Sequence, residues 1–504
     1  MHYPWWHVPY LTAPKLIAVI SVVHVLVSHY AVGGGLFLAV EVGHAYRSRD
    51  REYLSYLRGH ARFFVLLTVV FGAITGVGIW WTIGLTSPLA TELLIRTFVF
   101  GWATEWVFFV IELVAAFIFL YYWDRLAEKT HAAIGWIYAL AAWISLVLIT
   151  GITAFMLNSG DWSFHAGSRN FWVAFFNPQF LPQTIARTGG ALLLSSLYVY
   201  LHASLTTRNV RLRDMIASRS ARPAMLGAVL VTVGGIGWFV FLPDTAAATL
   251  ASTAVLNVLM ALIFALTAVV FVLLYLGPYR NPGWLSPGFA ASLCLFGIAA
   301  FATGEFIREA VRKPFVVQDA VLANQILPKE VTRLRSYGYL EGGVWTKAYV
   351  KQRYLSLVGD RVISREEVEK SIAESKLHGG PQLAYGMIVP HEGSIESKRF
   401  RKLPPLDRIV LGKVIFLYHC NDCHAGGLGY SALGPLLQGR SRDVVVDRIK
   451  RLDESYFMPP WCGTDDEAEV LADYLMTIKP RQPAGTRAWT KSAADSATTE
   501  GETP

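Results

Sequence analysis

Charged side chains are scarce in this sequence. Asp, Glu, Lys and Arg make up 16% of its 504 residues, whereas hydrophobic residues make up 53%. Because about a quarter of the residues in ordinary soluble domains are charged, this composition excludes an ordinary soluble globular protein and indicates an integral membrane protein. The net charge of +8 does not indicate a nucleic-acid partner, since the basic residues lie in short loops between apolar runs, where membrane topology accounts for them.

Cysteine is also rare, and its placement excludes a disulfide framework. Of the four cysteines, Cys420 and Cys423 share one short motif, Cys294 lies in an apolar run and Cys462 lies in the C-terminal region. A removable signal peptide is not expected either. The first apolar run is too long and lacks a small-residue cleavage site, so we interpret it as a retained helix.

Apolar runs long enough to cross a membrane occur eight times. Crossing about 30 Å of hydrocarbon takes about 20 helical residues. The runs are 16–42, 63–83, 97–123, 133–157, 185–205, 224–242, 251–276 and 289–307. We therefore predict an all-α fold, a polytopic membrane bundle of about eight transmembrane helices.

Basic residues predict the orientation of this bundle, because loops rich in arginine and lysine resist translocation and stay in the cytoplasm. They concentrate after the first, third, fifth and seventh runs: Arg47, Arg49, Arg51, Arg58 and Arg62; Arg125 and Lys129; Arg208, Arg211, Arg213, Arg219 and Arg222; and Arg280. Both termini of an even-numbered bundle are therefore expected outside the cytoplasm, in a protein of the cell membrane.

Composition divides the chain into four expected parts. Residues 1–315 form the transmembrane domain, and the polar stretch 316–402 forms an extracytoplasmic connector. Residues 403–480 form a small α-helical domain on the same side of the membrane. Residues 481–504 have the small, polar composition that is typical of disorder.

The C-terminal domain contains the motif Cys420-Asn421-Asp422-Cys423-His424. In such a motif the two cysteines form thioethers to a haem, and the adjoining histidine binds its iron. A redox dithiol or half of a zinc site are the alternatives. The helix-like segment before the motif and "FMPPWCGT" after it favour a haem, and Met458 is placed to be the second axial ligand unless it is a core methionine. The domain resembles a class I mono-haem cytochrome c.

Histidines occur within the first span, where a buried polar side chain is a functional candidate. His24 and His29 are five residues apart, or about 140° around a helix, so one metal cannot bind both from a regular helix. We expect one of them to be a haem-iron ligand. The alternative for each is a hydrogen bond between helices.

Carboxylates occur in two other spans. Glu105 and Glu112 lie seven residues apart, on one face of the third span, which suits a proton path or the edge of a haem. Glu305, Glu309 and Arg312 form one stripe at the end of the eighth span. A carboxylate can bind ferric haem and an arginine can pair with propionates, but an interfacial ladder of salt bridges is the simpler interpretation.

Together these residues resemble subunit I of the cytochrome bd oxidases over about residues 15–315. The similarity rests on His24, on "ATEWVFFVIELVAAFIFLYYWDRL", on Asn177-Pro178 and on "FIREAVRKPF". The resemblance implies that His24 and Glu309 are axial ligands of two high-spin haems. It also implies that Glu112 and Glu105 deliver protons beside them and that Arg312 lies near haem propionates.

The chain departs from this family in three places. The family's low-spin haem b is bound by a histidine at the position of Arg187, and its methionine partner matches Met260. The family's quinol-oxidising loop corresponds here only to the short "LPDTAAAT". The family's additional last helix is missing, and the chain leads instead to the cytochrome c-like domain.

We therefore hypothesise a bd-oxidase-like protein with one covalent haem c and one or two haems b, the second high-spin haem being b or d. Electrons would pass between an extracytoplasmic carrier and the membrane haems, where dioxygen is reduced. The alternative is a non-catalytic subunit that relays electrons between cytochrome c and quinone or a partner enzyme. The resemblance implies a second membrane subunit as partner, with lipid around the bundle.

Overall fold

The computed structural model describes residues 6–162, 170–342 and 405–478. The chain divides into two compact units. One is a helical bundle, Pro14–Glu330 with the segment Asp453–Pro460, and the other contains the N-terminal residues, Val331–Leu452 and the chain from Trp461 onward. Most of the expected connector and the whole expected tail lie outside the described residues.

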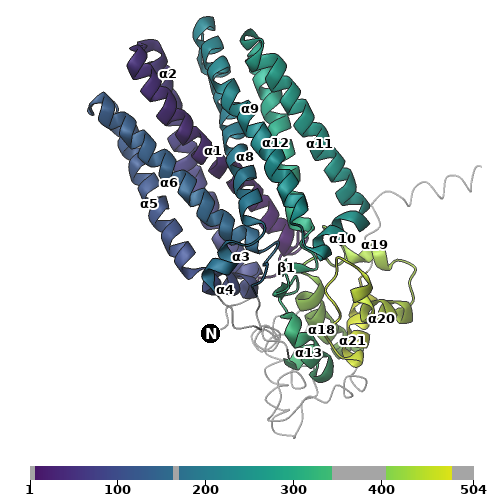
Figure 1. The fold of residues 1–504 in the computed structure, drawn as a ribbon. Coiled ribbons are helices and arrows are strands. Elements are labelled where there is room, and N and C mark those ends of the chain that lie inside the picture. The colour runs from purple at the N-terminus through teal and green to yellow at the C-terminus, as the bar shows by residue number, and fades with distance from the viewer. Residues whose placement is uncertain (1–5, 163–169, 343–404, 479–504) are drawn as a thin grey trace, which may run out of the picture. The chain divides into compact units, whose positions relative to one another are not determined.

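The helical bundle is built from long helices that run side by side (Figure 1). In chain order its elements are α1 (Ala13–Ser48), α2 (Arg51–Val65), η1 (Leu66–Phe71), α3 (Gly72–Thr86), α4 (Pro88–Thr97), α5 (Val99–Tyr121), α6 (Glu128–Phe155), α7 (Phe171–Phe175), α8 (Phe180–Thr206), α9 (Val210–Val240), α10 (Asp244–Ser252), α11 (Ala254–Leu274), η2 (Tyr275–Tyr279), η3 (Pro282–Trp284) and α12 (Pro287–Ala310). A two-stranded antiparallel sheet, β1 (Phe315–Val317) and β2 (Val321–Leu322), and the turn η4 (Pro328–Glu330) follow.

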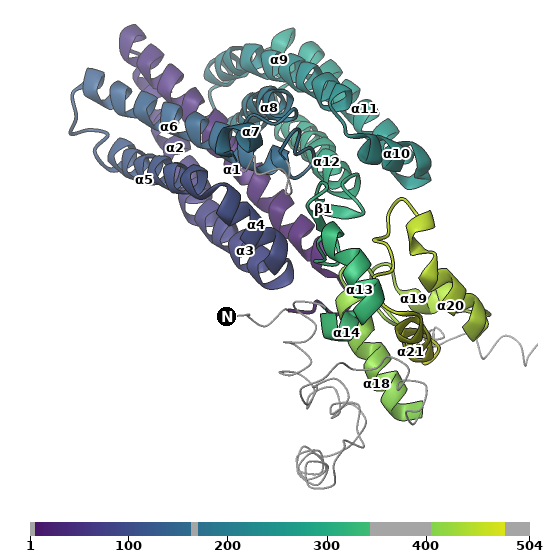
Figure 2. The same cartoon turned by 60° about the horizontal axis from the view of Figure 1, so that its bottom comes forward.

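All eight predicted spans correspond to long helices, with α2, η1 and α3 forming one continuous span. Seven of the described helices are long and apolar enough to cross a membrane, and α8 is the exception. Figure 2 shows α8 in the interior of the bundle, where it packs against α6, α9 and α12. Because other helices surround it, α8 can be less apolar than the helices that face lipid. The all-α bundle is confirmed.

Small residues let α8 approach its neighbours closely, which is how helices pack in membranes. A Cβ atom added to Gly189 would lie 2.6 Å from the Gly227 carbonyl oxygen of α9, and one added to Gly33 of α1 would lie 2.0 Å from the Ala191 oxygen. These contacts require glycine. They also explain the lower hydropathy of α8, since packing against protein does not need large apolar side chains.

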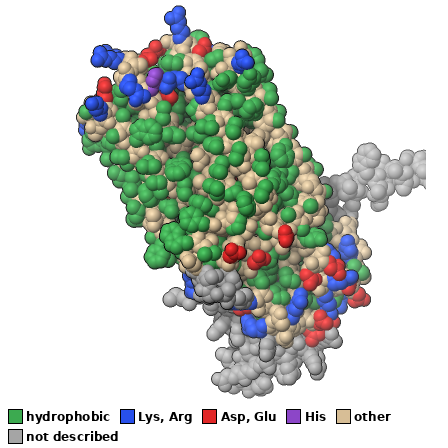
Figure 3. Space-filling model, in the orientation of Figure 1, with side chains coloured by type: hydrophobic (Ala, Val, Ile, Leu, Met, Phe, Trp, Pro, Cys, Tyr) green, Lys and Arg blue, Asp and Glu red, His purple; other side chains and the backbone are tan. Residues whose placement is uncertain are grey.

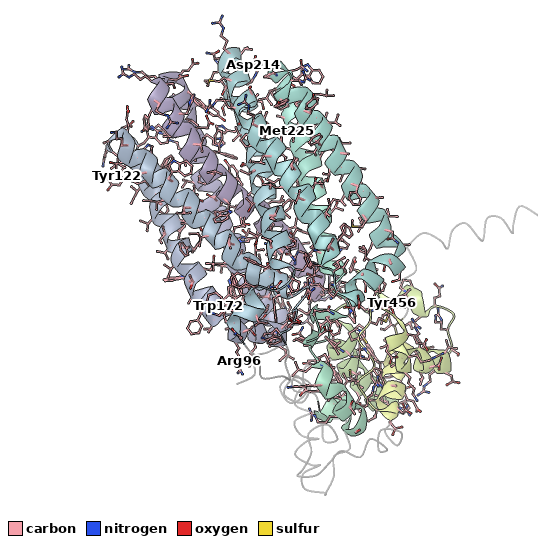
Figure 4. The ribbon with its side chains drawn as sticks, viewed as in Figure 1. Arg96, Tyr122, Trp172, Asp214, Met225 and Tyr456 are labelled. Atoms are coloured by element: carbon pink, nitrogen blue, oxygen red, sulfur yellow. The ribbon has the colours of Figure 1, made fainter. Side chains whose placement is uncertain are left out.

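The basic residues that predicted the orientation gather at one end of the bundle, and most of them lie on the ends of helices such as α2 and α9 rather than in loops. Figure 3 shows Lys and Arg side chains gathered there, beyond a broad belt of hydrophobic side chains. In Figure 4, Tyr122 and Asp214 lie at this end, and Arg96 and Trp172 lie at the opposite end. We call the first end the arginine-rich end, and its charge is the asymmetry from which the orientation was predicted.

The second unit contains α13 (Val331–Tyr337), α14 (Tyr339–Gly342), α18 (Pro405–Ile415), η6 (Phe416–Cys420), α19 (Leu433–Leu437), α20 (Arg442–Lys450) and α21 (Asp465–Leu475); the turn η7 (Leu452–Glu454) lies at its boundary with the bundle. Helix α21 begins with a capping box between Thr464 and Glu467. The buried Glu467 carboxylate also accepts hydrogen bonds from the backbone N–H groups of Tyr339 and Leu340 at 2.7 and 2.9 Å. One carboxylate therefore ties the start of α14 to α21.

Helices α18 and α21 cross at Gly412. A Cβ atom at this glycine would lie 2.2 Å from the Val470 carbonyl oxygen and 2.6 Å from the Tyr474 Cβ atom. The turn η6 continues directly from α18 and ends at Cys420, the first residue of the motif, so this crossing sets the position of the motif in its domain.

We predict that Gly412→Ala destabilises the second unit by about 1–3 kcal/mol, because the two helices must separate to accommodate the methyl group. Thermal unfolding of the purified protein, followed by circular dichroism at the haem Soret band, measures this. Val444→Ala, on the exposed face of α20, is the control and should leave the midpoint unchanged. An unchanged midpoint in the Gly412 variant would contradict the crossing.

Candidate functional site

The haem motif forms a tight turn at the end of η6. The N–H groups of Cys423 and His424 both donate to the carbonyl oxygen of Cys420, at 3.0 and 2.8 Å. Both cysteines are thiols that no disulfide bond joins. The turn therefore presents two thiols and an imidazole from one short stretch, as covalent haem attachment requires.

The His424 ring is oriented so that its Nε2 atom could bind a haem iron. Its Nδ1 lies 2.9 Å from the Ser431 carbonyl oxygen, so Nδ1–H donates there and Nε2 keeps its lone pair. Burial lowers the pKa of His424, which favours the neutral imidazole that an iron ligand must be. The residues present fit a haem.

The loop that carries Ser431 is held by the N-terminal segment. The Tyr430 N–H donates to the Tyr10 carbonyl oxygen at 2.6 Å. At Gly429 φ is +127°, and a Cβ atom there would lie 2.3 Å from the same oxygen, so this position requires glycine. The N-terminal residues thus help to orient the histidine ligand, a role that the sequence did not reveal.

The two alternatives to a haem fit the structure less well. A redox dithiol needs a lowered thiol pKa, but burial raises the pKa of Cys420 to about 12. A zinc site needs further ligands, and no group of three or more His, Cys, Asp or Glu side chains that could hold a metal occurs in the described parts of the chain. Burial likewise raises the pKa of Cys462 to about 12, in keeping with a packing role.

Met458 lies in the segment Asp453–Pro460, which groups with the helical bundle. Its neighbour Phe457 packs against an apolar cluster of Leu157, Ala246, Leu256, Ile307 and Val311. Met458 itself is partly buried, and its N–H donates to the Ser455 oxygen at 3.3 Å. Its role as the second axial ligand stays a prediction.

In the bundle, Glu105 and Glu112 both face Ser145 of α6. The Ser145 hydroxyl donates to Glu105 Oε1 at 2.9 Å and also interacts with the Glu112 carboxylate. The two carboxylates on α5 are thus linked through one hydroxyl on the neighbouring helix. The sequence predicted their common face but not Ser145, which becomes recognisable only once α5 and α6 are paired.

His24 faces α3. Its Nδ1 lies 3.1 Å from the Thr75 hydroxyl, and a Cβ atom at Gly76 would lie 3.0 Å from its Cε1. Thr75 therefore orients the ring, and Nε2 is the nitrogen left for a metal. Among the described residues, His24 and Glu309 share no hydrogen bond or ion pair.

The acidic stripe on α12 is paired with arginines. Glu305 pairs with Arg308 at 2.9 Å, and Glu309 pairs with Arg312, which also donates to the Val316 oxygen at 2.6 Å. The salt-bridge ladder that was the simpler interpretation is present, with Arg308 as a member that the sequence stripe did not include. Arg312 Nε is buried and has no hydrogen-bond partner, so a donor remains for an anionic group such as a propionate.

His29, Arg187 and Glu305 come together from α1, α8 and α12. They lie within electrostatic range of one another, and the buried His29 ring lies edge-on to Phe301 at 4.8 Å between centroids. A buried arginine needs a counter-charge. Glu305, which pairs with Arg308, is also within electrostatic range of Arg187.

Met260 lies on α11, partly buried in the apolar cluster around Ile307 and Val311. This is the packing environment of an ordinary core methionine. Its role as a haem ligand stays a prediction.

Comparisons with known proteins extend over part of the residues described above. Residues 15–252 match the family model of cytochrome bd terminal oxidase subunit I. This span includes His24, Glu105, Glu112 and Arg187 but ends before Met260, Glu309 and Arg312. The family match therefore covers the N-terminal part of the predicted site and not the α12 carboxylates.

Among solved structures, the chain is similar to the bd oxidase from Geobacillus thermodenitrificans. The TM-score is 0.52 and the sequence identity 18%, over 61% of this chain and 89% of that chain. This likeness shows that the bundle has the fold of a bd oxidase subunit. No protein of curated function matches the sequence.

We predict that Cys420→Ser and Cys423→Ser each weaken covalent haem attachment and that the double variant abolishes it. Haem staining of the denatured polypeptide after electrophoresis detects the covalent link. Cys462→Ser and Cys294→Ser are matched controls, because both side chains are buried thiols outside the motif. Staining that survives in the double variant would refute attachment at this motif.

Proposed function

We propose that this protein transfers electrons between a haem c, held by Cys420, Cys423 and His424, and haems in the membrane bundle, where dioxygen is reduced. When bound, the haems supply the irons that carry electrons and the open position at which oxygen reacts. The observation that carries the proposal is the hydrogen bond from His424 Nδ1 to Ser431, because it prepares a histidine for iron in a domain joined to a bd-oxidase-like bundle.

The residues of the bundle have separate tasks in this proposal. His24, oriented by Thr75, and Glu309 bind the membrane haems, and Arg312 stabilises a propionate. Glu112 and Glu105 pass protons through Ser145, because oxygen reduction consumes protons as well as electrons. The arginine-rich end lies in the cytoplasm, which puts the domain with the motif outside.

The electron partners follow from the same arrangement. The join between α9 and α11 is only the short helix α10, so a quinol-oxidising loop of the family's kind has no counterpart there. We therefore propose a soluble extracytoplasmic carrier as the partner of the haem c domain. Exposed apolar side chains on α5, among them Trp106, Val114 and Phe117, suit lipid or a second membrane subunit.

A second function is favoured by one observation, the buried Arg187 lying within electrostatic range of Glu305. A scaffold that has replaced a haem ligand with an arginine and a compensating carboxylate has lost one redox centre. It could serve as a non-catalytic relay between cytochrome c and quinone or a partner enzyme. The two functions differ in whether a membrane haem has an open axial position.

A carbon monoxide difference spectrum of the dithionite-reduced protein separates the two functions. We predict a shift in a haem that is not c-type, because carbon monoxide needs the open position that an oxygen-reactive haem has. Glu309→Gln should change this spectrum, whereas Glu92→Gln, a carboxylate paired with Arg96 on α4, should not. Membrane haems without any shift in the wild type would leave the relay as the function.

We also predict that Glu112→Gln and Ser145→Ala slow oxygen uptake by at least about tenfold while the haem content is retained, since a positioned proton donor contributes on this scale or more. Uptake driven by a reduced c-type cytochrome measures the effect. Ser196→Ala, on α8 and hydrogen-bonded only to backbone oxygens, is the control. Equal rates in all three variants would remove these residues from the proton path.

A further inference from the structure

Two buried histidines near the arginine-rich end differ in their hydrogen bonding. His131 of α6 uses both ring nitrogens, since Nδ1 lies 2.8 Å from the Tyr46 hydroxyl and Nε2 lies 2.8 Å from the Phe119 oxygen. His60 of α2 is fully buried, and its Nε2 lies 3.0 Å from the Tyr30 hydroxyl, but its Nδ1 has no hydrogen-bond partner among the residues that the structure describes. A buried polar atom without a hydrogen bond is destabilising, so it calls for an explanation.

Other unpartnered atoms surround His60. Nδ1 of His202 on α8 and the hydroxyl of Tyr56 on α2 are also buried without a hydrogen bond. The His60 ring lies 4.7 Å from the His202 ring and 5.8 Å from the Tyr56 ring, and the latter two lie 5.4 Å apart. We call these three residues with Tyr30 the histidine–tyrosine cluster. A buried water typically makes about three hydrogen bonds. The three polar atoms without a partner among these packed rings are therefore enough to hold one water.

The cluster is continuous with groups nearer the arginine-rich end. Tyr56 stacks on Tyr53 with ring centroids 6.2 Å apart. The Tyr53 hydroxyl donates to Glu41 at 2.8 Å, and Arg219 pairs with the same carboxylate at 2.5 Å. The Arg219 side chain is 31% exposed, so this group reaches solvent at the end that carries the basic loops.

On the other side, the cluster leads toward the carboxylates of α5. Tyr30 lies within electrostatic range of Tyr138 on α6. Tyr138 lies within electrostatic range of Glu112 and interacts with the Thr68 side chain. Thr68 lies in η1, a π-helical insertion of a kind that is frequent at functional sites.

We propose that the histidine–tyrosine cluster takes up protons from the arginine-rich face and passes them to Glu112. A proton from water binds His60 Nδ1, the proton on Nε2 moves to the Tyr30 oxygen, and the Tyr30 hydroxyl proton moves on toward Tyr138 through water. The imidazole then returns to its first tautomer. One N–H bond forms at Nδ1 as the other breaks at Nε2, and exchange of the ring proton through water restores the starting tautomer. The imidazole is neutral before and after the transfer, so the cluster acts as a relay without an additional reactant.

The inference rests on the proposed function for its destination, Glu112, but its test does not need oxygen. Reduction of the membrane haems adds negative charge that draws protons into the bundle. We predict that Tyr30→Phe and His60→Gln slow this uptake at least tenfold when the full-length protein is reduced in unbuffered solution with a pH-indicating dye. The haem content and the carbon monoxide spectrum should stay as in the wild type.

Tyr46→Phe is the matched control, because it removes the hydroxyl from the other histidine–tyrosine pair, which has no unpartnered nitrogen nearby. Its proton uptake should equal that of the wild type. Wild-type uptake rates in Tyr30→Phe would overturn the relay, as would a wild type that takes up no protons on reduction. If His60→Gln does not assemble, Tyr30→Phe alone decides, because it keeps the ring.

The outcomes also separate this inference from the proposed function. A protein with no oxygen-reactive haem but with proton uptake that depends on Tyr30 would lose the oxidase function and keep the relay. A protein that reduces oxygen at the same rate with or without the Tyr30 hydroxyl would keep the oxidase function and lose the relay.

Discussion

The structure depends on the high cost of an unpaired charge inside a membrane. Several carboxylates that the described part of the bundle buries have an opposite charge or a hydrogen-bond donor beside them. Glu41 has Arg219 and Tyr53, and Glu305 has Arg308. Glu105, which has no basic partner of this kind, is held by a hydroxyl. That exception matters, because a carboxylate without a fixed counter-charge can exchange a proton, whereas an ion-paired carboxylate resists protonation.

The same constraint explains why the helices approach so closely around α8. Charged and polar side chains from different helices can meet only if the backbones are near each other, and glycines at the crossings make this possible. Gly33 brings α1 against α8, and Gly190 of α8 lies beside the His29 ring. Arg187 is buried in this setting with the Glu305 carboxylate within electrostatic range. Charges on different helices can therefore compensate one another inside the bundle.

The sequence predicted those features that depend only on residues close to one another along the chain. Helix spans follow from runs of apolar residues, so they could be found without any tertiary contact, and the Cys420–His424 motif was recognised from a fixed local spacing alone. Ser145, Thr75 and the His60–His202 contact could not be found, because each depends on which helices pack together. The pairing of Glu305 with Arg308 was missed for a different reason: the expected stripe followed one helical row, and the arginine three residues along lies beside it.

The two proposals place electrons and protons on opposite sides of the membrane. The haem motif lies in the part of the chain that the basic loops predict to be outside, and the histidine–tyrosine cluster lies at the arginine-rich end of the bundle. If electrons enter from one side and the protons that they meet enter from the other, each turnover moves charge across the membrane. One charge crossing 100 mV stores about 2.3 kcal/mol. A relay built from Tyr30 and His60 therefore has a consequence that a structural cluster lacks, since loss of proton uptake from the arginine-rich face would abolish energy storage even if oxygen reduction continued with protons from outside.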